Sequence, residues 1–145
     1  MLTIPDVRQR DDWSCGAACL AALFRFHRTR RPWWLAQLPN PDRGMSPDTV
    51  EAALFAVFGR PPIRGRLDLA DLRHLAATGR PAICAVTWAA GPHWVICRGV
   101  ARGRVGYHDP THGPGSMPAA EWLAGWRDEP ATSPYQSFGL AGWPG

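Results

Sequence analysis

The chain has 145 residues, of which 46% are hydrophobic and 19% are charged. This composition excludes a disordered or fibrous protein, and the length suits one domain that buries a sizeable core. Sixteen arginines and twelve acidic residues give a net charge of +4. Since the arginines are scattered and no nucleic-acid-binding motif accompanies them, we expect no nucleic-acid partner.

No segment has the features of a membrane span or an export signal. Apolar stretches such as 17–23 are far shorter than the ~20 residues that a span needs, and the N-terminus reaches Asp6 without an apolar core. We therefore expect a protein that stays in the cytoplasm without membrane insertion. Its four cysteines are expected to be free thiols, and their spacing fits no zinc site, so no metal or other cofactor is expected.

The first half of the chain is expected to be helical, because its apolar runs are bounded by caps and breakers. The predicted segments are a helix from Cys15 to His27 after the N-cap Ser14, a short turn at 32–38, a helix from Pro47 after the N-cap Ser46 to the stop at Gly59, and a helix from the cap Asp68 to the stop at Gly79.

Short apolar or alternating runs separated by Gly-containing turns follow, and these predict an antiparallel sheet. The predicted strands are 81–88, 93–100 and 104–108. A last short helix is expected at 118–126, followed by a Gly/Pro/Ser-rich tail in which Tyr135, Phe138 and Leu140 are the apolar positions. Helices followed by strands indicate an α+β fold, and we expect one stand-alone domain over 1–145.

The segment from Gln9 to Cys19 is the first candidate for chemistry. A thiol on the first turn of a helix faces unsatisfied N–H groups and the positive end of the dipole, which favour the thiolate and hence nucleophilic attack. Gly16 would leave room for a substrate backbone, and the Gln9 amide could donate a hydrogen bond to an oxyanion. The alternative is that Cys15 and Cys19 are small core residues.

Two residues of the predicted sheet are the candidates to complete a catalytic site. His93 follows a Gly-Pro turn at the start of one strand, and Asp109 ends the next strand. In an antiparallel pair, these two side chains would meet at one edge, where a carboxylate orients an imidazole that pairs with the thiol. His108 should point to the opposite face, His112 lies in a nearby loop, and Trp94 is expected to line a cleft.

These motifs together resemble cysteine peptidase family thirty-nine, the bacteriocin-processing, double-glycine leader peptidases of papain-like fold. The resemblance rests on Gln9 with Cys15-Gly16, on His93-Trp94-Val95-Ile96, and on Asp109-Pro110, and it extends over almost the whole chain. It implies that Cys15 is the nucleophile, His93 the general base and acid, Asp109 the residue that orients it, and Gln9 the oxyanion-hole side chain. Ser14 departs from the family pattern, in which many members carry an acidic residue there.

The resemblance therefore implies a papain-like fold, in which a helical half that begins with the nucleophile helix packs on a C-terminal antiparallel sheet. The expected activity is that of a thiol endopeptidase that removes a leader peptide after a Gly-Gly-type site from a bacteriocin or similar precursor. The partners would be this peptide and an export transporter. Two alternatives stay open: an acyltransferase or amidase with another substrate, and a non-catalytic peptide-binding module.

Overall fold

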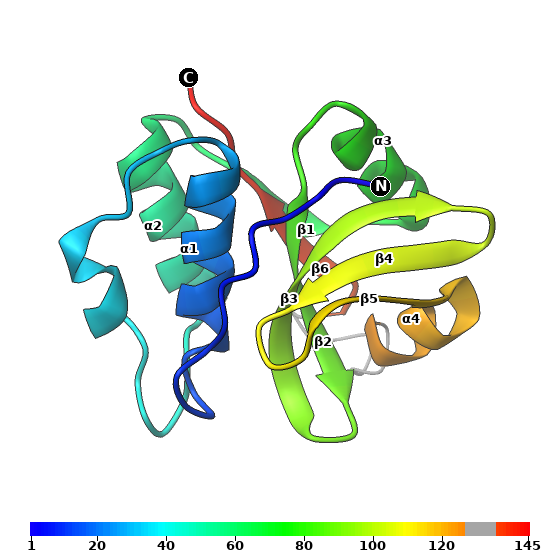
Figure 1. Cartoon of the computed structure of the whole chain (residues 1–145), viewed down its shortest axis with the longest axis horizontal. Helices are drawn as coiled ribbons and strands as arrows, with labels where there is room; N and C mark the ends of the chain where they lie inside the picture. The colour runs from blue at the N-terminus through cyan, green and yellow to red at the C-terminus, as the bar shows by residue number, and fades with distance from the viewer. Residues whose placement is uncertain (127–135) are drawn as a thin grey trace.

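A computed structural model of the chain describes residues 1–126 and 136–145. Helices predominate in its first half and strands in its second half (Figure 1). The helices are α1 (Cys15–Phe26), the 3₁₀ helix η1 (Trp33–Gln37), α2 (Pro47–Phe58), α3 (Leu69–Ala77) and α4 (Ala119–Trp126). The strands are β1 (Ile63–Arg66), β2 (Ala82–Trp88), β3 (Gly91–Ala101), β4 (Arg104–Asp109), β5 (Gly113–Pro118) and β6 (Phe138–Ala141).

The strands form one antiparallel sheet in the order β1-β6-β2-β3-β4-β5. Its middle is the continuous run of β2, β3 and β4, in which His93 pairs with Val86 and Ile96 with His108. The neighbouring strands are joined by short turns, so residues far apart in the sequence, at the start of β3 and the end of β4, reach the same end of the sheet. This end is where the candidate site lies.

Helices cover the sheet on both faces and create two apolar cores. Side chains of α1 and α2 pack with Ile83, Trp94 and Ile96 of the central strands. Side chains of α3 and α4, among them the fully buried Trp122, pack on the other face with the alternate residues of these strands, such as Val95. The alternation follows from the period of two in a strand, and it holds α1, whose first residue is Cys15, against one face.

The predicted helices and central strands are confirmed. Ser46 accepts a hydrogen bond from Thr49 N–H at the start of α2, Gly59 ends this helix with φ of 74°, and Asp68 forms a capping box with Asp71 at the start of α3. The mixed helix and antiparallel-sheet architecture confirms the expected α+β class. Of the three apolar tail positions, Phe138 and Leu140 belong to β6, whereas Tyr135 lies outside the described residues.

Three short strands were not expected from the sequence, namely β1, β5 and β6. Strand β1 has a single apolar residue, and within residues 1–126 and 136–145 it pairs with β6 alone. Strand β5 begins Gly-Pro-Gly, which is typical of a turn. Gly115 is nevertheless required there, because a Cβ atom at this position would lie 2.7 Å from the Tyr107 hydroxyl on β4.

The N-terminal segment before α1 is bound to the β3–β4 end of the sheet. The N–H of Leu2 donates to the Arg98 carbonyl at 2.8 Å, and the N–H of Gln9 donates to the Pro110 carbonyl at 2.9 Å. Between them, the Asp6 carboxylate lies 2.9 Å from Nε2 of the buried His108. These contacts fix the course of the chain from the end of β4 to the first turn of α1.

The position of Gly16 has a different cause from the one expected. A Cβ atom on Gly16 would lie 3.1 Å from the Met45 Cβ and Sδ atoms and 3.2 Å from the Trp94 ring. The space next to the helix is therefore filled by the protein itself, and the expectation that it admits a substrate backbone is wrong. Glycine here lets α1 approach the loop before α2 and strand β3.

We predict that Gly16→Ala destabilises the protein by about 1–2 kcal/mol. Overpacking of this kind costs roughly 1–3 kcal/mol, which exceeds the gain of up to about 1 kcal/mol from the better helix propensity of alanine. Chemical denaturation at pH 7 measures the change. Gly79→Ala is not a suitable control because φ there is 73°, whereas Ala70→Gly on the exposed face of α3 reports propensity alone. A Gly16→Ala variant as stable as the wild type would contradict this account.

Candidate active site

Cys15 is the first residue of α1, as expected, but the residue before it does not cap the helix. Ser14 occupies the N-cap position, and its side chain makes no capping hydrogen bond. Its hydroxyl instead accepts hydrogen bonds from the backbone N–H groups of Arg10 and Asp11, at 3.1 and 3.3 Å, and so folds the preceding turn. The first N–H groups of α1 thus have no side-chain acceptor at the N-cap, and they give the thiol an electropositive setting.

His93 and Asp109 form a direct pair across the sheet end. The imidazole Nε2 lies 2.7 Å from the carboxylate Oδ1, and their side chains are 16% and 5% exposed. The same Oδ1 accepts a hydrogen bond from the backbone N–H of Thr111 at 2.8 Å. The meeting of the two side chains that the strand spacing predicts is therefore present in the structure.

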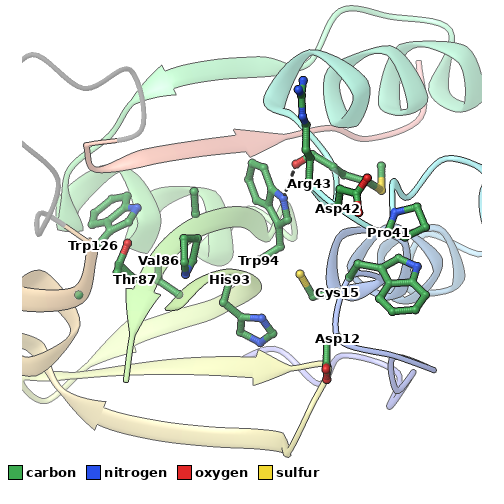
Figure 2. Close-up of a pocket in the computed structure, with 16 residues that line it drawn as sticks. Asp12, Cys15, Pro41, Asp42, Arg43, Val86, Thr87, His93, Trp94 and Trp126 are labelled. Carbon is green, nitrogen blue, oxygen red and sulfur yellow. Dashed lines mark hydrogen bonds between the residues drawn. The ribbon is translucent and has the colours of Figure 1, made fainter. Parts of the chain in front are cut away.

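The Cys15 thiol is the second neighbour of the imidazole, and its proximity contributes to the raised pKa of His93. Because Nε2 is bound to Asp109, Nδ1 is the ring nitrogen that remains for an interaction with the thiol. Figure 2 shows the Cys15 side chain and the His93 ring as neighbours that come from α1 and β3. A thiol, an imidazole and a carboxylate thus stand in sequence, which is the order that nucleophilic catalysis by a thiolate requires.

The electrostatics of this row favour a charged imidazole. Burial acts against protonation of His93, but the hydrogen bonds with Cys15 and Asp109 and their negative charges outweigh it, so the pKa of His93 is raised. Burial acts in the opposite direction on Asp109, yet the hydrogen bonds from His93 and from the Thr111 N–H lower the pKa of this carboxyl group. Each partner stabilises the ionised form of the other.

A cleft of about 480 Å³ opens beside these residues (Figure 2). Cys15 and His93 both line it, and one wall is formed by the loop 41–45 before α2. Trp94 also lines it, as expected, and its indole N–H donates to the Met45 carbonyl at 2.9 Å. This hydrogen bond ties β3 to the opposite wall, so the width of the cleft is fixed by the fold.

Gln9 lies close to the site but outside the lining of this cleft. Its amide nitrogen donates to the Asp11 carbonyl at 2.7 Å, and its Oε1 accepts a hydrogen bond from the Thr111 hydroxyl at 2.9 Å. The amide is therefore held at both ends, and one of its two N–H groups is committed to the protein. The structure brings Cys15, His93 and Asp109 together. Gln9 lies on the N-terminal segment outside the cleft lining, and Thr111 connects it to Asp109.

Thr111 was not singled out by the sequence analysis, yet it contacts two of the candidate residues. Its backbone N–H binds Asp109 and its hydroxyl binds Gln9. The signal in the sequence that could have identified Thr111 is its position two residues after Asp109. His108 binds Asp6, on the side away from His93, as the strand alternation predicts. His112 is exposed, and its charge contributes to the lowered pKa of Asp109.

The other three cysteines are buried and lie apart from this chemistry. Burial raises the pKa of Cys19 and of Cys84, and it raises that of Cys97 to about 11. Cys19 donates to the Trp94 carbonyl at 3.3 Å. Among the described residues, no group of three or more His, Cys, Asp or Glu side chains is placed to hold a metal ion.

The model of the peptidase C39 family matches residues 3–131, so the chain belongs to this family. No curated protein sequence matches it. Within residues 1–126 and 136–145, no helix is long and apolar enough to cross a membrane.

Solved structures share the fold at low sequence identity. A double-glycine-motif protease from an AMS/PCAT transporter, crystallised with its leader peptide, is 20% identical with a TM-score of 0.71, and the match covers 95% of this chain and 89% of that one. A putative C39-like peptidase from Bacillus anthracis is 11% identical with a TM-score of 0.76, covering 96% and 94%. The peptidase domain of Streptococcus ComA, a bifunctional ABC transporter of a quorum-sensing pathway, is 13% identical with a TM-score of 0.65, covering 94% and 96%. These matches confirm the papain-like fold.

We predict that Asp109→Asn lowers the pKa of His93. The substitution removes the negative charge that holds the imidazolium, while burial, which disfavours the charged form, remains. Titration of the His93 ring by NMR measures the change, with Asp6→Asn as the control that acts on His108 instead. An unchanged His93 pKa in Asp109→Asn would contradict the pairing.

A second prediction concerns the Gln9 amide. Thr111→Val removes the hydroxyl that binds Gln9 Oε1 but keeps the backbone N–H that binds Asp109, so the Gln9 side-chain NH₂ signals should shift while the His93 titration stays as in the wild type. The loss of one partly exposed hydrogen bond should cost roughly 0.5–1 kcal/mol of stability. Thr111→Ser keeps the hydroxyl and should restore the NH₂ signals; a Gln9 signal unmoved by valine would refute the contact.

Proposed function

We propose that the chain is a cysteine endopeptidase in which Cys15 is the nucleophile, His93 the general acid and base, and Asp109 the residue that orients the imidazole. The observation that carries this proposal is the row of thiol, imidazole and carboxylate, with His93 2.7 Å from Asp109 and the thiol and imidazole both on the 480 Å³ cleft. Membership of the peptidase C39 family supports it independently.

In the first half of the reaction, the Cys15 thiolate attacks the carbonyl carbon of the scissile peptide bond. A carbon–sulfur bond forms, and the electron pair of the carbonyl moves onto its oxygen. When this oxyanion collapses, the carbon–nitrogen bond breaks, and the leaving amine takes a proton from the imidazolium of His93. The raised pKa of His93 suits this step, because it favours the protonated imidazole that donates the proton.

In the second half, a water molecule attacks the thioester while the neutral imidazole of His93 accepts its proton. The carboxylic acid product leaves, and the sulfur regains its electron pair. Asp109 remains ionised throughout, consistent with its lowered pKa, and stabilises the imidazolium each time it forms.

The oxyanion needs hydrogen-bond donors that are fixed before the reaction. The Cys15 backbone N–H, at the start of α1, is one candidate. The Gln9 amide is the other, because its Oε1 is held by Thr111 and one N–H by Asp11, which leaves the second N–H without an acceptor among the described residues. In this arrangement Thr111 fixes which end of the amide carries the donor.

The substrate that we propose is a precursor peptide cut after a Gly-Gly-type site, with removal of its leader. One observation supports this class: the solved double-glycine protease bound to its leader peptide shares the fold. A transporter is the corresponding partner, since two of the similar structures come from transporters. In this proposal, residues 1–145 act as one peptidase domain.

The experiment that tests this function is mass analysis of a panel of double-glycine precursor peptides incubated with the wild type, with Cys15→Ala and with Cys19→Ala. Cys19 is a buried thiol one helical turn away, which makes Cys19→Ala the matched control. We expect cleavage after Gly-Gly by the wild type and by Cys19→Ala, and a loss of at least about 10³-fold in Cys15→Ala.

Other outcomes of this experiment are equally decisive. Cleavage by Cys15→Ala would overturn the role of the thiol. A product joined to an added amine or thiol, in place of the free acid, would identify an acyltransferase. Failure of the wild type to cut any peptide, together with slow alkylation of Cys15 at neutral pH, would favour a peptide-binding module.

A further inference from the structure

An indole lies behind the imidazole of His93, on the sheet face that packs against α3 and α4. The cross-strand partner of His93 is Val86, which belongs to this second apolar core, and Trp88 follows two residues later on β2. Side chains two residues apart on a strand point to the same face, so Trp88 is the diagonal neighbour of His93. The proposed reaction assigns no role to this indole.

The rings of Trp88 and His93 form an aromatic pair. Their centroids are 6.0 Å apart, and their planes are tilted by 49°. His93 lines the catalytic cleft, whereas Trp88 is not among the described residues that line it and packs instead on the second core. The indole therefore approaches the imidazole from the core side and leaves its other side to the cleft.

The hydrogen bond to Asp109 does not by itself fix the plane of the imidazole. This bond constrains one atom, Nε2, whereas the χ2 torsion of histidine is broad because it turns about an sp³–sp² bond. Nε2 lies closer to the rotation axis than Nδ1 does, so a rotation that barely moves Nε2 changes the direction in which Nδ1 points. A ring packed against the imidazole restricts this rotation.

Trp88 is itself held in place by two contacts. The ring of Tyr107 on β4 meets the indole edge to face, with centroids 5.2 Å apart and planes 64° apart. The second contact is with Gly125 of α4, where a Cβ atom would lie 2.7 Å from Cδ1 and 2.9 Å from Nε1 of the indole. A strand on one hand and a helix on the other thus fix the indole next to the imidazole.

The position of this indole has two local costs. Gly125 does not have a positive φ, so its backbone conformation does not require glycine, and glycine disfavours a helix. The indole N–H of Trp88 is buried and has no acceptor among the described residues, which costs free energy. A smaller apolar residue at position 88 would avoid both costs, which indicates that the indole does more than fill the core.

We propose that Trp88 is a positioning residue: its indole packs on the core side of the His93 imidazole and fixes the plane of this ring. In that plane Nε2 meets Asp109 and Nδ1 remains for an interaction with Cys15. Trp88 acts through His93 and touches neither the substrate nor the reacting atoms. The inference rests on the proposed function, because the row of thiol, imidazole and carboxylate is taken to be catalytic.

The first measurement uses the wild type and needs no substrate. A nuclear Overhauser effect between the indole protons of Trp88 and the ring protons of His93 reports their contact in solution. We expect this effect to be present, and its absence from the folded protein would overturn the proposal.

The second measurement is the rate at which iodoacetamide alkylates Cys15, located by peptide mass mapping, in the wild type, Trp88→Leu, Trp88→Phe, Trp143→Leu and His93→Ala. A thiol reacts as its thiolate, which a neighbouring imidazolium favours, so this rate reports the placement of His93. Trp143→Leu is the matched control, because Trp143 is likewise partly buried against the second core, and its ring packs against two arginine side chains.

We expect Trp88→Leu to slow the alkylation about fivefold or more, toward the rate of His93→Ala, because a rotated imidazole no longer favours the thiolate. With a precursor peptide that the wild type cuts, Trp88→Leu should lower kcat about tenfold to hundredfold and leave KM nearly unchanged, since the indole lies outside the cleft lining. Trp88→Phe keeps an aromatic ring and should restore both rates, and Trp143→Leu should keep them.

Wild-type alkylation and kcat in Trp88→Leu would overturn the proposal. An equal loss in Trp143→Leu, or a Trp88→Phe variant as slow as Trp88→Leu, would do so as well, because either result indicates a structural role alone. A raised KM with kcat unchanged would make Trp88 a substrate contact instead. The proposed function fails by a separate route, namely a wild type that cuts no peptide while its alkylation still depends on Trp88.

Discussion

Everything at the candidate site depends on the contact between the first turn of α1 and the end of the β3–β4 pair. The helix brings a thiol with an electropositive backbone around it, and the strands bring an imidazole already bound to a carboxylate. Neither the helix nor the strand pair carries the thiol, the imidazole and the carboxylate together. Gly16, Met45 and Trp94 set how closely the helix approaches β3, so the packing of the core also sets the distance between the Cys15 thiol and the strand that carries His93.

The N-terminal segment also supports the contact between α1 and the β3–β4 pair, because it is hydrogen-bonded to both strands and to the loop after β4. It is bound to β3 at Leu2, to the buried His108 through Asp6, and to the loop after β4 through Gln9. That loop also holds Asp109 through Thr111. The amide of Gln9 and the carboxylate of Asp109 consequently share a support, although these residues are 100 positions apart in the sequence.

Sequence patterns were sufficient for the parts of the fold whose signals are local. Caps such as Ser46 and Asp68 give helix starts directly, and the spacing of His93 and Asp109 follows from a short hairpin. Strands such as β1 and β6 escape this reasoning because they are short and acquire their partners from distant segments. The Ser14 hydroxyl illustrates the same limit, since its bonding to the turn at 10–11, in place of the helix, depends on how the preceding chain folds back.

The four thiols differ in a way that matters for chemical work on this protein. Burial raises the pKa values of Cys19, Cys84 and Cys97, whereas Cys15 lines the cleft beside His93. Thiolates react and thiols do not, so burial and raised pKa values protect these three sulfurs from an alkylating reagent in the folded chain. Uptake of further label by these thiols would therefore report the opening of one of the two apolar cores, since Cys19 lies in the first core and Cys84 and Cys97 lie in the second.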